Sequence, residues 1–196
     1  MNKHIMLDIE TLGTRGDSAI LSIGGCAFTI GEGATLAGED PNASFLVSIK
    51  PEFYEEFDPN NEYHVDPNTV AWWEQQGTAA KEALSINQVV TPGEALDRMD
   101  EFFQHHAFEK TYKLDGDRLW ANPTAFDAVI LRHAASVERT SDNDVPWHHR
   151  QETCQRTFMY LNQDKPFGLP DETLVAHRAD HDAIKQARIV QEILRG

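Results

Sequence analysis

The sequence predicts an α/β protein, a single domain over residues 1–196 with a central sheet flanked by helices. Three observations support this fold class. Apolar segments of strand composition crowd the start of the chain, and short Gly- and Pro-rich turns between them favour antiparallel neighbours. Segments with apolar residues at helical spacing follow later. A length of 196 residues is enough for one domain with a full core.

Each predicted element has its own boundary. The pair Gly24-Gly25 suggests a bend or bulge in the second strand. Asp66-Pro67 and Thr124 are typical helix starts, with Thr124 as a candidate N-cap. The acidic stretch 51–66 is expected to be a surface loop. The expected elements are strands over residues 5–9, 19–30, 43–49 and 114–121, helices that start at Asp66 and Thr124, and helices over residues 92–103, 151–161 and 179–194.

Two carboxylates stand on one face of the first predicted strand. Side chains alternate along a strand, so Asp8 and Glu10 share a face while Leu7 and Ile9 share the other. Buried neighbouring carboxylates repel each other, and a divalent ion that prefers oxygen ligands, such as Mg²⁺ or Mn²⁺, removes this penalty. An isolated pair of this kind is more often a solvated strand end, so the pair gains meaning only from the later segments.

A third carboxylate opens a helix in the middle of the chain. Asn122-Pro123 breaks the preceding strand, and Asp127 falls in the first turn of the helix that follows. A helix dipole favours a negative charge there. This preference is also the ordinary explanation for an Asp at such a position, so Asp127 by itself predicts little.

The third segment holds His177 and Asp182, five residues apart. That spacing corresponds to about 140° around a helix, so the two side chains converge only if His177 lies in the loop that leads into the helix of Asp182. Gly168 and Pro170 break the preceding segment, and apolar residues at helical spacing follow. The alternative is that His177 and its neighbour His181 are ordinary surface histidines.

Taken together, the three segments resemble the DEDDh branch of the DnaQ-like 3′–5′ exonucleases. In that family an Asp-x-Glu pair lies on the first strand, as at Asp8 and Glu10, and a second Asp opens a middle helix, as at Asp127. A His-x-Ala-x-x-Asp motif closes the site, and His177 to Asp182 fits it at every fixed position. The resemblance spans nearly the whole chain and implies an RNase H-like fold with a mixed central sheet.

Within this family the chain is similar to the subgroup of phage exonuclease A and bacterial 3′–5′ exoribonuclease-like proteins. Members of that subgroup carry a Trp-rich helix, as at Trp72-Trp73, and an Arg-Thr pair in a later helix, as at Arg156-Thr157.

The resemblance implies hydrolysis of phosphodiester bonds from the 3′ end of single-stranded or short RNA or DNA. It implies two Mg²⁺ or Mn²⁺ ions, with His177 as the general base that takes a proton from the attacking water. The implied metal ligands are Asp8, Glu10, Asp127 and Asp182.

Contacts to the terminal nucleotide are also implied. Trp72 and Trp73 are candidates to stack on bases, although adjacent aromatics on an amphipathic helix are more often partly core. The implied substrate-binding residues are Thr11, Leu12, Asn122, Phe126, Trp72, Trp73 and Arg156.

The net charge of −15 at first opposes a nucleic-acid partner, because proteins that clamp long duplexes present basic surfaces. Four of the acids belong to the predicted metal site, however, and an enzyme that acts on ends holds few nucleotides. A short or single-stranded substrate is therefore expected. A local positive rim is expected from Arg132, Arg150, Arg156 and Lys185.

Other features set limits. There is no apolar run long enough to cross a membrane, and Cys26 and Cys154 lack metal-ligand spacing. No secretory leader is expected, because residues 1–4 lack the hydrophobic region of a signal peptide. A cytoplasmic protein is expected, in a bacterium or, if phage-encoded, in its host. A homodimer is compatible with the sequence, but no interface pattern identifies one.

Two other functions remain open at this point. One is a catalytically inactive nuclease fold that binds nucleotide ends or a partner protein. The other is a metal-dependent phosphoesterase that acts on mononucleotides. The complete set of four acids and His177 favours the exonuclease, since a binding module needs no general base. RNA and DNA are not distinguished by the sequence.

Overall fold

A computed structural model describes residues 2–56, 62–84, 89–165 and 173–195 of the protein. Within these ranges the centre is a six-stranded sheet in the order β4-β3-β2-β1-β5-β6. The first three strands are antiparallel neighbours, β5 and β6 continue parallel to β1, and β4 runs parallel to β3. The strands are β1 (His4–Thr11), β2 (Ile20–Phe28), β3 (Ser44–Ile49), β4 (Val89–Val90), β5 (Arg118–Ala121) and β6 (Glu152–Cys154).

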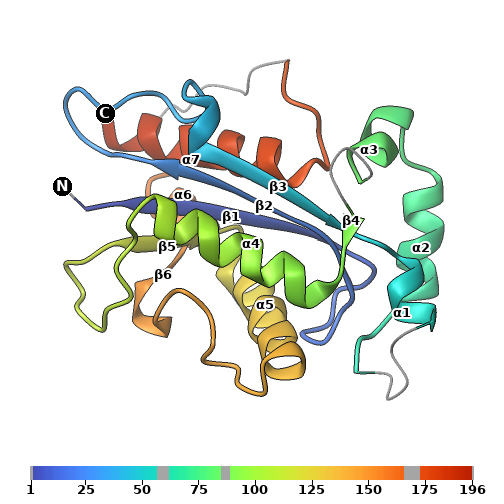
Figure 1. Ribbon diagram of the computed structural model, residues 1–196. Coiled ribbons are helices and arrows are strands. Elements are labelled where there is room, and N and C mark those ends of the chain that lie inside the picture. The colour runs from blue at the N-terminus through green and yellow to red at the C-terminus, as the bar shows by residue number, and fades with distance from the viewer. Residues whose placement is uncertain (1, 57–61, 85–88, 166–172, 196) are drawn as a thin grey trace.

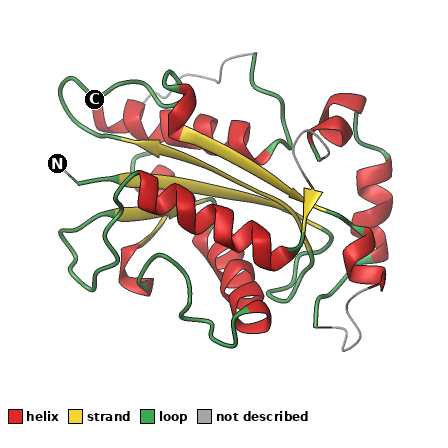
Figure 2. Ribbon diagram, in the orientation of Figure 1, coloured by secondary structure: helices red, strands yellow, loops and turns green. Residues whose placement is uncertain are grey.

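Helices cover both faces of this mixed sheet, as Figures 1 and 2 show. The last helix, α7, packs against β1, β2 and β3, whereas α4 and α5 pack against the opposite face and against each other. The helices are α1 (Glu52–Glu56), α2 (Pro67–Glu74), α3 (Thr78–Ala83), α4 (Pro92–His105), α5 (Thr124–Glu138), α6 (Gln155–Leu161) and α7 (Ala179–Arg195), with short 3-10 turns η1 (Pro41–Ala43) and η2 (His149–Gln151).

Two hydrophobic clusters, one on each face of the sheet, form the core. Ile5, Leu7 and Ile9 of β1 belong to the larger cluster, which includes residues of α4 and α5. Met6 belongs to the smaller one, which includes Ala183 of α7. Because side chains alternate along β1, Asp8 and Glu10 share the face of Met6 and look towards α7.

The predicted first three strands and their antiparallel pairing are confirmed, but two predictions about local structure are wrong. No bulge occurs at Gly24-Gly25, where β2 pairs regularly with β1; the register shifts instead between Glu10 and Thr11. Thr124 is not an N-cap: it is the first residue of α5, and no side chain caps this helix. Both glycines serve close packing instead: an added Cβ would lie 2.2 Å from the backbone nitrogen of Asp180 at Gly24 and 2.5 Å from the Phe45 ring at Gly25.

The prediction also missed several short elements. Residues 151–161 were expected to be one helix, but the chain first forms η2 and then pairs with β5 as β6. The strand expected from residue 114 begins at Arg118, and α1 lies within the stretch expected to be a loop. Short strands such as β4 and β6 depend on hydrogen bonds from a neighbouring strand, which local sequence does not reveal. Gly168 and Pro170 lie outside the described residues.

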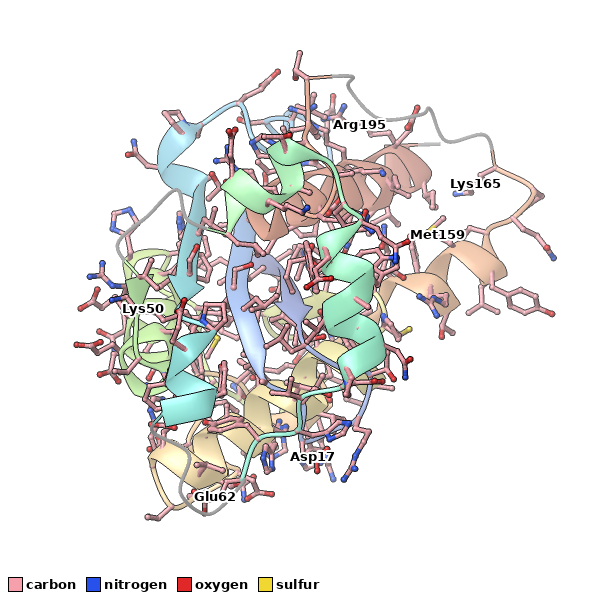
Figure 3. The ribbon with its side chains drawn as sticks, turned by 90° about the vertical axis from the view of Figure 1, so that its right-hand side faces the viewer. Asp17, Lys50, Glu62, Met159, Lys165 and Arg195 are labelled. Carbon is pink, nitrogen blue, oxygen red and sulfur yellow. The ribbon has the colours of Figure 1, made fainter. Side chains whose placement is uncertain are left out.

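In Figure 1 the two ends of the chain lie at the same side of the molecule, and α1, α2 and α3 lie at the other. Figure 3 looks at this second side, where α2 stands in front of the strands. Among the described helices, none combines the length and hydropathy needed to span a membrane.

Candidate active site

The first strand supplies two of the predicted ligands as expected. Asp8 and Glu10 are partly buried, and the Glu10 side chain is only 12% exposed. Their neighbours Leu7 and Ile9 are buried in the core on the other face. The alternation predicted for a half-buried strand therefore presents both carboxylates to the same side of the sheet.

Gly24 lets α7 approach this strand. It pairs with Asp8 across the β1–β2 ladder. A Cβ at Gly24 would lie 2.2 Å from the backbone nitrogen of Asp180 and 2.3 Å from the carbonyl carbon of Ala179. Only a residue without a side chain admits the first turn of α7 at this distance, so Gly24 brings the start of that helix beside Asp8.

Asp127 reaches the site from the first turn of α5. It is 3% exposed, and its Oδ1 accepts a hydrogen bond of 3.2 Å from the backbone N–H of Ile9. Its Oδ2 is buried, and none of the described residues donates to it. A buried carboxylate oxygen without a donor is costly unless a cation or water meets it.

His177 lies in the loop before α7 and Asp182 lies on the helix, as the spacing predicted. The backbone N–H of His177 donates to Asp182 Oδ2 at 2.8 Å, and His177 Nδ1 lies 4.0 Å from Glu10 Oε1. His177 adopts φ 60°, a left-handed conformation that is uncommon outside glycine and often found at functional sites.

Asp180 and His181, which lie between His177 and Asp182 in the sequence, are bound to other groups. Both carboxylate oxygens of Asp180 accept from the guanidinium of Arg178, at 2.8 and 2.9 Å. Nδ1 of His181 accepts from the backbone N–H of Val175 at 2.8 Å. Each therefore stabilises the loop and the start of α7, and Asp182 is the acid of this segment that faces the site.

Burial raises the pKa values of all four carboxylates, and the charges of neighbouring acids raise those of Asp8 and Glu10 further. Burial, together with the charges of Asp182 and Asp127, raises the pKa of Glu10 to about 8. Burial raises the pKa of Asp127 to about 7, against backbone hydrogen bonds and Arg156. Burial and the other three acids hold the pKa of Asp8 well above its usual range. Burial likewise raises the pKa of Asp182, opposed by the hydrogen bond from His177 and by Lys185.

These groups fit divalent cations. Four carboxylates that resist ionising together, one of them with an orphaned buried oxygen, form the oxygen-rich donor set that Mg²⁺ and Mn²⁺ prefer. Ligand atoms of Glu10, His177 and Asp182 all lie within 4.8 Å of one another, close enough to share an ion. A bound cation would relieve the repulsion and satisfy the free oxygen of Asp127.

Gln186 is a site residue that the sequence analysis missed. It lies on α7, one helical turn after Asp182, and its Nε2 donates to Asp8 Oδ1 at 2.7 Å. The backbone carbonyl of Gln186 accepts from the buried side chain of Gln155. The spacing of four residues from Asp182 was visible in the sequence and places both side chains on one helix face.

A pocket of about 430 Å³ opens beside Glu10. Thr11, Phe126, Trp72 and Trp73 contribute to its lining. The two tryptophans differ: Trp72 is 41% exposed, whereas Trp73 is 7% exposed and its indole N–H donates to the carbonyl of Thr11 at 2.9 Å. Trp73 thus belongs to the core, which is the alternative stated for this pair. Trp72 keeps part of its ring exposed.

The remaining predicted substrate-binding residues do not all lie at the pocket. Leu12 packs in the larger core rather than in the pocket lining. Asn122 is half-buried, and Arg156 is near enough to lower the pKa of Asp127. Of the expected positive rim, Arg132 is bound to Glu152 in an ion pair of 2.8 Å.

A mixed sheet flanked by helices, with acids converging from β1, α5 and α7 beneath a histidine, defines the class of DnaQ-like 3′–5′ exonucleases with the RNase H-like fold. Within this class, the chain belongs to the 3′–5′ exoribonuclease Rv2179c-like domain family, whose model matches residues 3–194. This confirms the family predicted from the sequence. No curated protein is significantly similar to the chain in sequence.

Solved structures share the fold. The zinc-bound Escherichia coli ExoI–ssDNA complex has a TM-score of 0.61 at 13% identity, over 98% of this chain and 40% of that chain. Cell-death related nuclease 4 (CRN-4) also has a TM-score of 0.61 at 13% identity, over 100% of this chain and 64% of that chain. A product-bound exonuclease I gives 0.58 at 15% identity, over 97% and 43%. The chain thus spans 40–64% of the length of these proteins.

Proposed function

We propose that this chain removes nucleotides from the 3′ end of single-stranded or short RNA by metal-dependent hydrolysis. The observation that carries the proposal is the convergence of acids from β1, α5 and α7 with a histidine: Asp8, Glu10, Asp127, Asp182 and His177. Family membership supports the direction of cleavage and an RNA substrate.

The four carboxylates would hold two divalent ions, Mg²⁺ or Mn²⁺. Such a pair of ions activates the attacking water and stabilises the leaving 3′ oxygen. The chain's own contribution is to hold the ligands in place: β1 fixes Asp8 and Glu10, and Asp127 is fixed by the N–H of Ile9. Asp182 is held by the N–H of His177.

His177 is the proposed general base. Its side chain is 42% exposed, so water and substrate reach it, and Nδ1 faces the carboxylates at 4.0 Å from Glu10 Oε1. Histidine suits the role of general base because the ordinary pKa of its side chain lies near neutral pH. Trp72 and Trp73 contact the ring edge-on, with centroids 5.0 and 6.0 Å from it, and hold its orientation.

The pocket beside Glu10 is the proposed site of the 3′-terminal nucleotide. Phe126 and the exposed face of Trp72 offer aromatic surfaces on which bases stack without regard to sequence. Arg156 and Lys185, which lower the pKa values of Asp127 and Asp182, are the proposed contacts to the phosphate backbone. Because the whole chain carries a net charge of −15, long duplexes are expected to be poor substrates.

We further propose that residues 1–196 form one domain, because one sheet includes all six strands from β1 to β6 and the last helix, α7, packs against it. A cytoplasmic location and a homodimer stay predictions. Size-exclusion chromatography with light scattering measures the oligomeric state directly.

The test uses 5′-labelled single-stranded RNA and DNA of equal sequence with Mg²⁺, Mn²⁺ or EDTA. We expect a ladder of products that shorten from the 3′ end only when metal is present. Cleavage of RNA is expected to be faster than cleavage of DNA. Asp8→Ala is expected to abolish it, whereas Asp97→Asn, an exposed acid on α4, is the matched control that keeps it. If folded protein leaves the RNA intact under every metal condition, the result would instead support a binding module. Cleavage of a mononucleotide diester, with no preference for longer strands, would support the phosphoesterase.

A further inference from the structure

Basic residues gather beside the edge strand β6, although the protein as a whole is acidic. The chain has 17 Lys and Arg against 32 Asp and Glu. Three basic side chains stand just before β6, and two more reach the same place from other segments. These residues, the β6 basic cluster, are Lys110, Arg118, His148, His149 and Arg150.

We propose that the β6 basic cluster is an exosite, a binding surface outside the active site, for the phosphate backbone of single-stranded RNA on the 5′ side of the cleaved end. The proposal rests on the proposed nuclease function for the identity of its ligand. Binding of RNA at the cluster can nevertheless be measured without cleavage.

Hydrogen bonds hold the cluster together from three segments of the chain. The guanidinium of Arg118, at the start of β5, donates to the backbone carbonyl of Arg150 at 2.8 Å. The ammonium of Lys110 donates to the carbonyls of Asn143 and Val145, both at 2.7 Å, in the loop before η2. These acceptors are neutral, so Arg118 and Lys110 are fixed in place and keep their positive charge.

The charges that act most strongly on His148 are all positive. Burial is the largest cause that lowers the pKa of His148, and the next causes are charges, those of His149, Arg150, Lys110 and Arg132. The charge of Glu152, the first residue of β6, is balanced by its ion pair with Arg132 at 2.8 Å. A local concentration of positive charge on an acidic protein attracts a polyanion to this one place.

Two side chains of the cluster are available to a ligand. Arg150 and His149 are exposed, and neither side chain has a hydrogen bond within the described residues. A guanidinium matches the oxygens of a phosphate group with two parallel hydrogen bonds. The ring of His149 lies against that of His148, with centroids 4.1 Å apart, and bases of single-stranded RNA stack on rings of this kind.

Strand β6 leads from the cluster towards the proposed active site. β6 runs parallel to β5, and β5 to β1, so β6 points in the same direction as the strand of Asp8 and Glu10 (Figure 1). Arg150 lies two residues before β6, and Arg156, which is within electrostatic reach of Asp127, lies two residues after it. Six residues span at most about 20 Å.

This distance predicts a dependence on the length of the RNA. A stacked strand advances about 3.4 Å per nucleotide, so about six nucleotides separate the active site from the cluster. A longer strand with its 3′ end in the active site reaches Arg150, whereas a trinucleotide does not. The exosite would therefore hold long strands and release products that have become too short to reach it.

The experiment measures binding first, on the full chain in EDTA. Fluorescence anisotropy follows a 5′-labelled single-stranded RNA of about 20 nucleotides, long enough to reach the cluster, and a labelled trinucleotide, each over a series of salt concentrations. Wild type is compared with Arg150→Gln and Arg150→Glu. Lys50→Gln and Lys50→Glu are the matched controls, because Lys50 is exposed and follows β3, away from β6 (Figure 3). Circular dichroism verifies that each variant is folded.

We expect Arg150→Gln to reduce the salt dependence of long-strand binding by about 0.7 in the slope of log affinity against log salt, the effect of one lost phosphate contact. Arg150→Glu should weaken binding of the long strand by at least about fivefold, the effect of an exposed charge contact. Affinity for the trinucleotide should stay unchanged, and both Lys50 variants should match wild type. With Mg²⁺, Arg150→Glu should raise KM for the long strand and leave kcat unchanged.

Unchanged affinity and salt dependence for the long strand would overturn the exosite. Equal weakening of the long strand and the trinucleotide would also overturn it, because Arg150 would then act on the active site itself. If poly-glutamate binds through Arg150 and RNA does not, the partner is an acidic protein and the assignment to RNA is wrong. Binding of RNA through Arg150 by a chain that cleaves no RNA with any metal would refute the nuclease and leave the RNA-binding surface standing.

Discussion

The side-chain amide of Gln186 donates a hydrogen bond of 2.7 Å to Oδ1 of Asp8, joining α7 to β1 across 178 residues of sequence. Gln186 is buried, and its own Oε1 has no donor among the described residues. The bond engages Oδ1 of Asp8 and so limits rotation of its carboxylate. Gln186 is thus a positioning residue for a proposed metal ligand.

Replacement of Gln186 by Leu should weaken binding of Mn²⁺ by about 10–100-fold, the usual effect of losing a partner that orients a ligand. Calorimetric titration measures this directly. Gln191→Leu is the matched control, because Gln191 is also buried on α7 but its Nε2 donates to the carbonyls of Thr29 and Thr35. It should lower the melting temperature and leave Mn²⁺ affinity unchanged. Equal metal affinities in the two variants would contradict the role of Gln186.

The variant His177→Ala should slow cleavage with Mg²⁺ by about 10²–10⁴-fold, the range expected for a lost general base. Binding of Mg²⁺ should change little, since the four carboxylates remain. Single-turnover rates between pH 6 and 8 (about the range in which histidine titrates) separate the chemical step from product release. Full activity across that range would show that another group takes the proton.

Replacement of Gly24 by Ala should separate α7 from the sheet. The added Cβ meets the backbone at Asp180 at 2.2 Å, and neither backbone yields easily. A loss of about 1–3 kcal/mol in the free energy of unfolding is expected for such overpacking, together with weaker Mn²⁺ binding. Gly77→Ala is the control, because nothing lies within 4 Å of the Cβ it would add. Urea denaturation and metal titration of both variants check the prediction.

The stability of the metal-free protein should fall as pH rises. The pKa of Glu10 is raised from 4.5 to about 8 in the folded chain, and that of Asp127 from 3.8 to about 7. Between its unfolded and folded pKa values, such a group keeps its proton in the folded chain but loses it in the unfolded chain. The unfolded chain therefore gains relative stability as pH rises through this interval. The melting temperature in EDTA should therefore decline between about pH 4 and pH 8, and Mn²⁺ should restore it most at the upper end.

Glu10→Gln removes one of these titrating groups while keeping its shape, so its melting temperature in EDTA should depend less on pH. A melting temperature that rises with pH in the metal-free wild type would contradict the raised pKa values of Glu10 and Asp127.

The two tryptophans of α2 should separate binding from stability. Trp72→Ala should raise KM for RNA by about 10-fold, since stacking contributes about 1–3 kcal/mol per base, and should leave the melting temperature nearly unchanged. Trp73→Ala removes a buried side chain and its bond to Thr11, and should destabilise the protein by about 3–5 kcal/mol. Equal effects of both variants on KM and on unfolding would show that α2 acts as one unit.

Much of the site was predictable because its pattern is local. Alternation along β1 put Asp8 and Glu10 on one face, and the five-residue spacing placed His177 in a loop before the helix of Asp182. Each inference needed only a few neighbouring residues and the geometry of one element. The fold class and the first three strands followed in the same way, from apolar runs between turns.

Other features depend on partners distant in sequence, and they were missed or misassigned. Gly24 suggested a bend, yet its small size serves the approach of α7. The strands β4 and β6 exist because β3 and β5 supply their hydrogen bonds.

The sequence by itself determined the family, the class of fold and the five groups proposed for the chemistry, because these follow from residue types at short, fixed spacings. Only the tertiary structure decided that Trp73 is core and Trp72 is exposed, that Asp180 and His181 are engaged by Arg178 and Val175, and that Gln186 orients Asp8. Those assignments rest on which surfaces meet when α2 and α7 pack against the strands. Packing between elements far apart in the chain is a property of the whole fold, and no short segment encodes it.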